Sequence, residues 1–147
     1  MHVRLQRESQ EMDSYNTNVA SEFFVLSALH RLGLTANLTL GNKKSVDIVV
    51  VRERGRALTV DVKGLAGKTS WPVDKVGDGK PGHFIVFVGY GGKISDPRVP
   101  PEVYVVPSEM VGPFVYVAPG GRRVVRVARL RKDAAAYRDA WHLFVDA

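Results

Sequence analysis

The chain has no cysteine, which excludes disulfide bonds and thiolate metal sites, so any metal ion must be held by oxygen or imidazole ligands. No apolar run approaches the roughly 20 residues that a membrane-spanning helix requires. The first residues lack the apolar segment of a secretory signal, and we expect a cytoplasmic protein without a membrane partner. The sequence also has no glycine-rich phosphate-binding loop, no repeat and no pair of histidines at metal-ligand spacing.

The 147 residues, 45% of them hydrophobic, are enough for one ordinary core, and we expect a single domain over residues 1–147. The net charge of +6 indicates an anionic partner. Much of this charge lies near the C-terminal end, in Arg122, Arg123, Arg126, Arg129, Arg131 and Lys132. A solvated basic helix would explain this cluster equally well, so charge alone does not establish nucleic-acid binding.

The first regular element is a helix that begins at Asn16 or Asn18 and stops at Gly33, after a loosely packed polar segment over residues 1–12. Apolar residues recur at helical spacing along it, and Glu22 lies among them rather than on the opposite, wet face. Glu22 is therefore a candidate functional acid. The alternative is an acid of the first turn, favoured there by the helix dipole.

Residues 46–63 predict a β-hairpin with an acid in each strand. Glu53, Arg54 and Gly55 fit a three-residue loop with glycine in the left-handed position, which sets Asp47 directly opposite Asp61. Polar side chains then share one face and apolar ones the other, as hydrophobic patterning of register requires. A two-residue Arg54-Gly55 turn would instead split the two acids between the faces.

Two carboxylates opposed across a strand pair destabilise a fold unless a cation lies between them. Mg²⁺ takes hard oxygen ligands, commonly one or two carboxylates together with water and substrate phosphate. The pair Asp47 and Asp61, with Lys63 two residues further on, therefore predicts a divalent-metal site. The alternative is that Lys63 only pairs with one of the acids at a wet sheet edge.

The rest of the chain predicts two buried strands over residues 83–90 and 102–107, an edge hairpin over 114–127 and a helix over 131–145. His83 stands at the entrance of the first strand, where a structural role is expected and a place in the lining of the site is the alternative. In the loop after Gly64, Lys68 and Trp71 are candidate contacts to phosphate and base. A tryptophan that folds back on the core is the alternative for Trp71.

The order of a helix with Glu22, a strand with Asp47 in Ser-Val-Asp-Ile-Val, and a strand with Asp61-Val62-Lys63 resembles the PD-(D/E)xK nuclease superfamily. Within it, the chain resembles the small stand-alone domains of the archaeal junction-resolvase type and members of unassigned function. The likeness covers about residues 16–107, with a C-terminal hairpin and helix over 113–146. It implies an α/β restriction-endonuclease-like fold, a central mixed sheet flanked by helices. Val46 replaces the proline of the family pattern, and the segment after Trp71 is shorter than the family's helix.

The resemblance implies a metal-dependent endonuclease that hydrolyses phosphodiester bonds of DNA. Asp47, Asp61 and the carbonyl of Val62 would hold Mg²⁺ or Mn²⁺, Lys63 would act on the attacking water, and Glu22 would complete the acid cluster. Lys43, Lys44, Lys68 and Trp71 would contact the nucleic acid. The alternatives are an inactive nucleic-acid-binding module and a protein-interaction module on the same fold, and a homodimer and a protein partner are further expectations.

Overall fold

The computed structural model describes residues 2–39 and 46–147, with side chains from Ser14 onward in the first helix. The elements, in chain order, are α1 (His2–Arg31), β1 (Thr35–Leu38), β2 (Ile48–Val51), β3 (Leu58–Leu65), β4 (Ser70–Pro72), β5 (His83–Gly89), β6 (Glu102–Pro107), the 3₁₀ turns η1 (Ser108–Met110) and η2 (Gly112–Phe114), β7 (Val115–Val117), β8 (Arg123–Arg126), α2 (Val127–Asp133), the 3₁₀ turn η3 (Ala135–Tyr137) and α3 (His142–Asp146).

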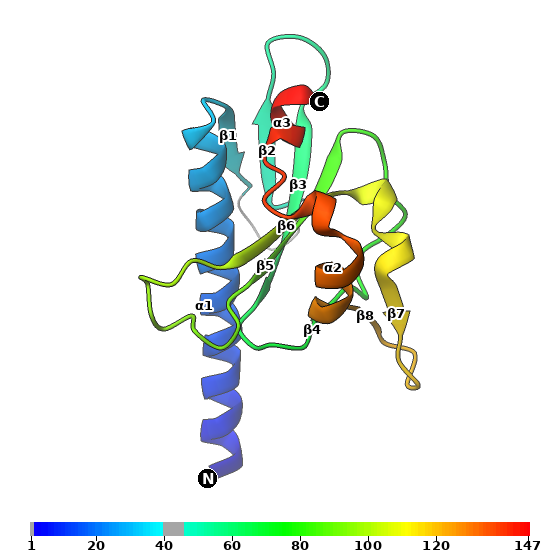
Figure 1. The fold of residues 1–147 in the computed structure, drawn as a ribbon. Coiled ribbons are helices and arrows are strands. Elements are labelled where there is room, and N and C mark those ends of the chain that lie inside the picture. The colour runs from blue at the N-terminus through cyan, green and yellow to red at the C-terminus, as the bar shows by residue number, and fades with distance from the viewer. Residues whose placement is uncertain (1, 40–45) are drawn as a thin grey trace.

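The main sheet has five strands in the order β1-β2-β3-β5-β6. Only the central pair, β3 and β5, is parallel, and the other neighbours run antiparallel. A second sheet has three antiparallel strands in the order β4-β8-β7. The predicted α/β class, a central mixed sheet flanked by helices, is confirmed (Figure 1).

The main sheet is covered on both faces around β5, which is buried from Phe84 to Gly89. The side chains of Phe84, Val86 and Val88 pack on one face with Val25 and Leu29 of α1 and with Phe144 of α3. Those of Ile85 and Phe87 pack on the other face with residues of the second sheet and of α2, namely Trp71, Val125 and Leu130. The continuous apolar run predicted for β5 is confirmed by this two-sided burial.

Helix α1 is longer than expected, because residues 2–12 are helical rather than a loose lead-in. This stretch contains no glycine or proline and is rich in Arg, Gln and Glu, which favour helix even without a core to pack against. The N-terminal half of α1 accordingly projects past the sheet (Figure 1). Over residues 2–39 and 46–147, no helix combines the length and the apolar character needed to cross a bilayer.

The predicted register of the hairpin is confirmed over β2, where Ile48 faces Val60 and Val50 faces Leu58. The predicted pairing of Asp47 with Asp61 does not continue this ladder. The backbone N–H of Asp47 donates instead to the carbonyl of Val60 over 3.0 Å, one residue out of step with the register. Gly55 has φ +85°, the left-handed conformation that the loop required.

The predicted C-terminal helix over residues 131–145 is wrong, since α2, η3 and α3 replace it. Arg138 leaves the helical path to form a bridge with Tyr104, and the N–H of Asp139 donates to Val103. Asp139 has φ +49°, a conformation that no continuous right-handed helix contains. Pairing with β6 therefore outweighs the local helical pattern.

Candidate functional site

The candidate site lies at an unpaired edge of β3. Strand β2 pairs only with residues 58–60 of β3, and the remainder of β3 pairs with β5 on its opposite edge. Because backbone groups alternate along a strand, Val62 turns its N–H and carbonyl toward the same edge as Val60. Asp47 Oδ2 accepts the N–H of Val62 over 2.7 Å, so its carboxylate continues the ladder where β2 is absent.

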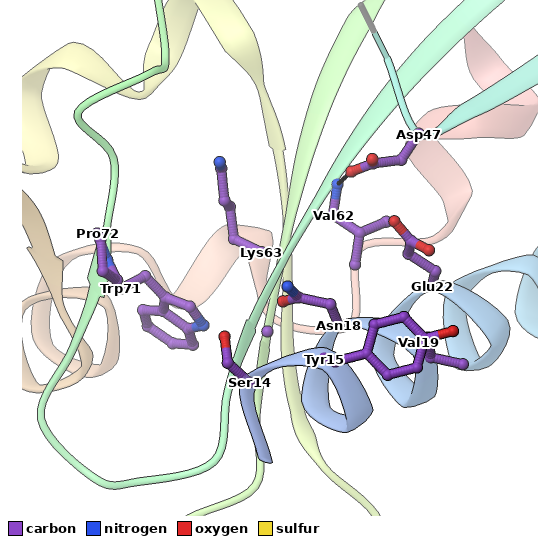
Figure 2. A pocket seen from close by; sticks show the side chains of 11 residues that line it. Ser14, Tyr15, Asn18, Val19, Glu22, Asp47, Val62, Lys63, Trp71 and Pro72 are labelled. Carbon is purple, nitrogen blue, oxygen red and sulfur yellow. Dashed lines mark hydrogen bonds between the residues drawn. The ribbon is translucent and has the colours of Figure 1, made fainter. Parts of the chain in front are cut away.

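This edge is one wall of an open hollow of about 540 Å³. Helix α1 supplies another wall through Tyr15, Asn18 and Glu22, which follow one another at the three- and four-residue spacing of a helix face. Figure 2 shows the carboxylates of Glu22 and Asp47 on the same side of the hollow, next to Val62. The helix therefore brings one predicted acid to the other.

Lys63 rises between these acids and a second wall formed by Trp71 and Pro72 of β4 (Figure 2). Four predicted site residues, Glu22, Asp47, Val62 and Lys63, thus share one hollow. Trp71 lines it too, but its side chain is fully buried, and its indole N–H donates to the carbonyl of Val88 over 3.1 Å. The expectation that Trp71 stacks on a base is therefore corrected: the ring packs in the core.

Asp61 turns away from this group in the structure. Its Oδ2 lies 2.9 Å from His83 Nε2, and both side chains line a neighbouring hollow with Lys75, Lys80 and Ser108. His83 is largely buried, with 11% of its side chain exposed, against 28% for Asp61. The two carboxylates therefore have different partners: the backbone N–H of Val62 for Asp47, and His83 for Asp61.

The oxygen donors at the edge of β3 suit a hard divalent cation in their chemistry. The carboxylates of Glu22 and Asp47 and the edge-facing carbonyl of Val62 are of the kind that Mg²⁺ or Mn²⁺ prefers. Among residues 14–39 and 46–147, no three acidic or histidine side chains gather closely enough to hold a metal ion. Asp61 is the third acid of the predicted metal site. In the structure its carboxylate is hydrogen bonded to His83 and does not face Glu22 and Asp47.

Of the lysines predicted to contact nucleic acid, Lys68 does not line this hollow. It is exposed and lines a smaller cavity together with Trp71 and Arg131. Lys43 and Lys44 lie outside the described residues.

Part of the basic cluster has a structural role. Arg131 and Arg138 both reach Glu102 on β6, at 2.8 Å and 3.9 Å. The guanidinium of Arg131 lowers the pKa of Glu102, and burial, together with the hydrogen bond to Glu102, raises the pKa of Tyr104 to about 12. Arg131 and Arg138 therefore attach the C-terminal segment to the main sheet through Glu102.

Two features of the site were not found from the sequence. Tyr15 and Asn18 line the hollow from α1, and their spacing from Glu22 was the available signal. The pairing of His83 with Asp61 depends on the parallel alignment of β3 and β5, which places Thr59 opposite His83. A parallel register joins strands across a long connection and leaves no local pattern in the sequence.

Gly64 holds α1 close to this edge, and Gly64→Ala is expected to destabilise the fold. A Cβ there would lie 2.3 Å from Ser21 Oγ and 3.1 Å from the Thr17 carbonyl, and Ser21 is fully buried. We expect a loss of about 1–2 kcal/mol in the free energy of unfolding, measured by urea denaturation. Gly67→Ala, where a Cβ meets nothing within 4 Å, is the matched control. Equal stability of the two variants would contradict this packing.

Comparisons with known proteins connect the chain to one fold. No protein-family model and no curated protein sequence matches it. Among solved structures, the chain is similar to a bacterial homing endonuclease, I-Ssp6803I, with a TM-score of 0.56 and 19% sequence identity. The alignment covers 90% of this chain and 93% of that one. At this identity the likeness shows the fold: the chain has a nuclease-like α/β fold along nearly its whole length.

Proposed function

We propose that the protein is a metal-dependent endonuclease of the PD-(D/E)xK type that hydrolyses phosphodiester bonds in DNA. The observation that carries the proposal is the hollow at the open edge of β3, where Glu22, Asp47 and Lys63 meet. The fold supports it, because the similar solved structure is described as a homing endonuclease. The net charge of +6 supports an anionic substrate.

In this proposal the acids are the cation ligands. Asp47, Asp61 and the carbonyl of Val62 would hold Mg²⁺ or Mn²⁺, with Glu22 completing the set, and Asp61 would exchange its contact with His83 for the cation. A bound divalent ion would supply an activated water and neutralise phosphate charge. Lys63 would orient the attacking water and stabilise the negative charge that develops on the phosphate.

The proposal is tested with the full chain and supercoiled plasmid DNA. We expect nicking in the presence of Mg²⁺ or Mn²⁺ and none with excess EDTA, because the acids alone cannot activate water. Cleavage that continues unchanged in EDTA would contradict the metal-dependent mechanism. Gel electrophoresis of plasmid forms over time measures the rate.

The pairing of Asp61 with His83 favours a second candidate, a DNA-binding module on the same fold. It predicts salt-sensitive DNA binding that survives both EDTA and Asp61→Ala, without cleavage under any metal. The homodimer and the protein partner stay predictions from the sequence.

A further inference from the structure

The second sheet continues directly from the candidate site. Its first strand, β4, supplies Pro72 to the hollow beside Lys63. Across the sheet, Pro72 pairs with Val124 of β8, which pairs with Tyr116 of β7, so these three residues form one row. Arg126 lies on the same face as Val124, two residues along β8. We name this face the outer face; its residues are Ser70, Pro72, Tyr116, Val124 and Arg126.

The outer face is open to solvent, whereas the opposite face belongs to the core. Pro72, Tyr116 and Arg126 are exposed, and 40% of the surface of Tyr116 is accessible. Trp71 and Val125, which alternate with them along the strands, are fully buried. The outer face therefore offers an aromatic ring and a guanidinium beside the hollow, at no cost to the core.

The excess positive charge of the whole chain lies in this region. Residues 113–138 contain seven Arg or Lys and one Asp, which gives a net charge of +6. That value equals the net charge of the entire protein, so the remaining residues sum to zero. An anionic partner is thus attracted toward β7, β8 and α2, although Asp74 and Glu102 from outside the segment neutralise part of this charge.

Within this region Arg126 differs in its contacts from Arg122, Arg129 and Arg131. Arg122 pairs with Asp74 at 3.2 Å, Arg129 with Asp133 at 2.7 Å and Arg131 with Glu102 at 2.8 Å. In the described part of the chain, Arg126 makes no ion pair, and its guanidinium lies over the ring of Tyr116 at 3.6 Å. Stacking fixes the plane of the guanidinium while leaving its N–H edge available to a phosphate.

We propose that the outer face binds the sugar–phosphate backbone of duplex DNA next to the bond held at the hollow, with Arg126 as the phosphate contact and Tyr116 as its support. This inference rests on the proposed function for its choice of partner. Strands lie about 4.8 Å apart, so the row from β4 to β7 spans roughly 10 Å. That length matches the axial rise of about three nucleotides of one strand.

The test measures binding of the full chain to a short fluorescein-labelled duplex in EDTA, by anisotropy at several salt concentrations. Arg126→Gln should raise Kd about fivefold, as expected for one exposed charged contact. It should also reduce the slope of log Kd against log salt concentration by about 1. Arg98→Gln is the matched control, since Arg98 is an exposed arginine paired with Asp96 outside the outer face, and it should change neither quantity.

The support by Tyr116 has its own readout. Tyr116→Phe keeps the ring under Arg126 and should bind as the wild type does, whereas Tyr116→Ala should reproduce the loss seen for Arg126→Gln. Equal losses in the Phe and Ala variants would assign the contact to the hydroxyl and overturn the supporting role of the ring. Unfolding midpoints of the variants, compared with that of the wild type, report any loss of fold.

The outcomes separate this inference from the proposed function. If the wild type cleaves DNA with Mg²⁺ but Arg126→Gln binds with unchanged affinity and salt slope, the outer face is not the DNA-binding surface. If Arg126→Gln weakens binding but no metal supports cleavage, the outer face stands and the endonuclease assignment fails. Loss of affinity only for single strands would identify base stacking on Tyr116 and overturn the duplex assignment.

Discussion

Replacing Lys63 by methionine is expected to reduce the rate of Mg²⁺-dependent DNA cleavage about 10²–10³-fold, the usual effect of removing one group that stabilises transition-state charge. The methionine keeps much of the aliphatic length but carries no ammonium. Lys63 lies between the acids and the wall formed by Trp71 and Pro72. Among the described residues that line the hollow, it is the one with a positively charged side chain. Single-turnover cleavage of a labelled duplex measures the effect on chemistry apart from binding.

Lys93→Met is the control for this variant, since Lys93 is an exposed lysine in the turn after β5. It should cleave at the wild-type rate. Cleavage by Lys63→Met at that same rate would remove Lys63 from the mechanism, whatever the metal dependence of the reaction.

Asp61→Asn separates the metal-binding role of Asp61 from its contact with His83. The amide is nearly isosteric with the carboxylate and still hydrogen bonds to the imidazole, so the local structure should persist. A cation ligand, however, needs the carboxylate charge. Weaker Mn²⁺ binding by this variant, followed by calorimetry, would therefore report ligation directly. Unchanged affinity would restrict Asp61 to its pairing with His83.

Gly79→Ala is expected to lower the free energy of unfolding by about 3 kcal/mol, the upper end of ordinary overpacking costs. A Cβ at Gly79 would lie 2.2 Å from the backbone nitrogen of Glu109 and 2.4 Å from the carbonyl carbon of Ser108. Backbone atoms cannot rotate aside as a side chain can, so the loop and η1 must separate. The N–H of Lys80 would then lose its bond to Ser108 Oγ, now 3.0 Å long.

Gly77→Ala is the matched control for this prediction, two residues earlier in the same loop. A Cβ there meets nothing within 4 Å, and the two changes restrict the unfolded chain equally. Urea denaturation of both variants measures the difference. Equal stability would show that the loop does not rest on η1 as described.

The hairpin shows how far local pattern reaches. Alternating polarity on residues 46–63 fixed which residues face each other, and Gly55 fixed the turn, because both depend on neighbours in the chain. The same pattern could not show that β2 ends while β3 continues. That difference in length leaves the backbone of Val62 open, and it gives Asp47 a backbone N–H to bind.

The segment after β6 shows the opposite case. Residues 131–145 have a helical pattern, yet pairing of Arg138 with Tyr104 breaks the helix. Likewise, the glycine-rich loop around Trp71 was compatible with either an exposed or a buried indole. The indole is buried because β4 of the second sheet places it against Phe87, with 5.2 Å between the ring centroids.

The sequence by itself determined the α/β class, the register of residues 48–50 against 58–60, and the identity of the candidate acids and lysine, since these follow from periodicity and residue chemistry. Only the tertiary structure decided which of them meet. Packing of α1 on β3 places Glu22 in the same hollow as Asp47. The parallel alignment of β5 with β3 places His83 within hydrogen-bond distance of Asp61. Such contacts join residues that are far apart in the chain. Their free energies depend on tertiary packing, which local sequence patterns do not describe.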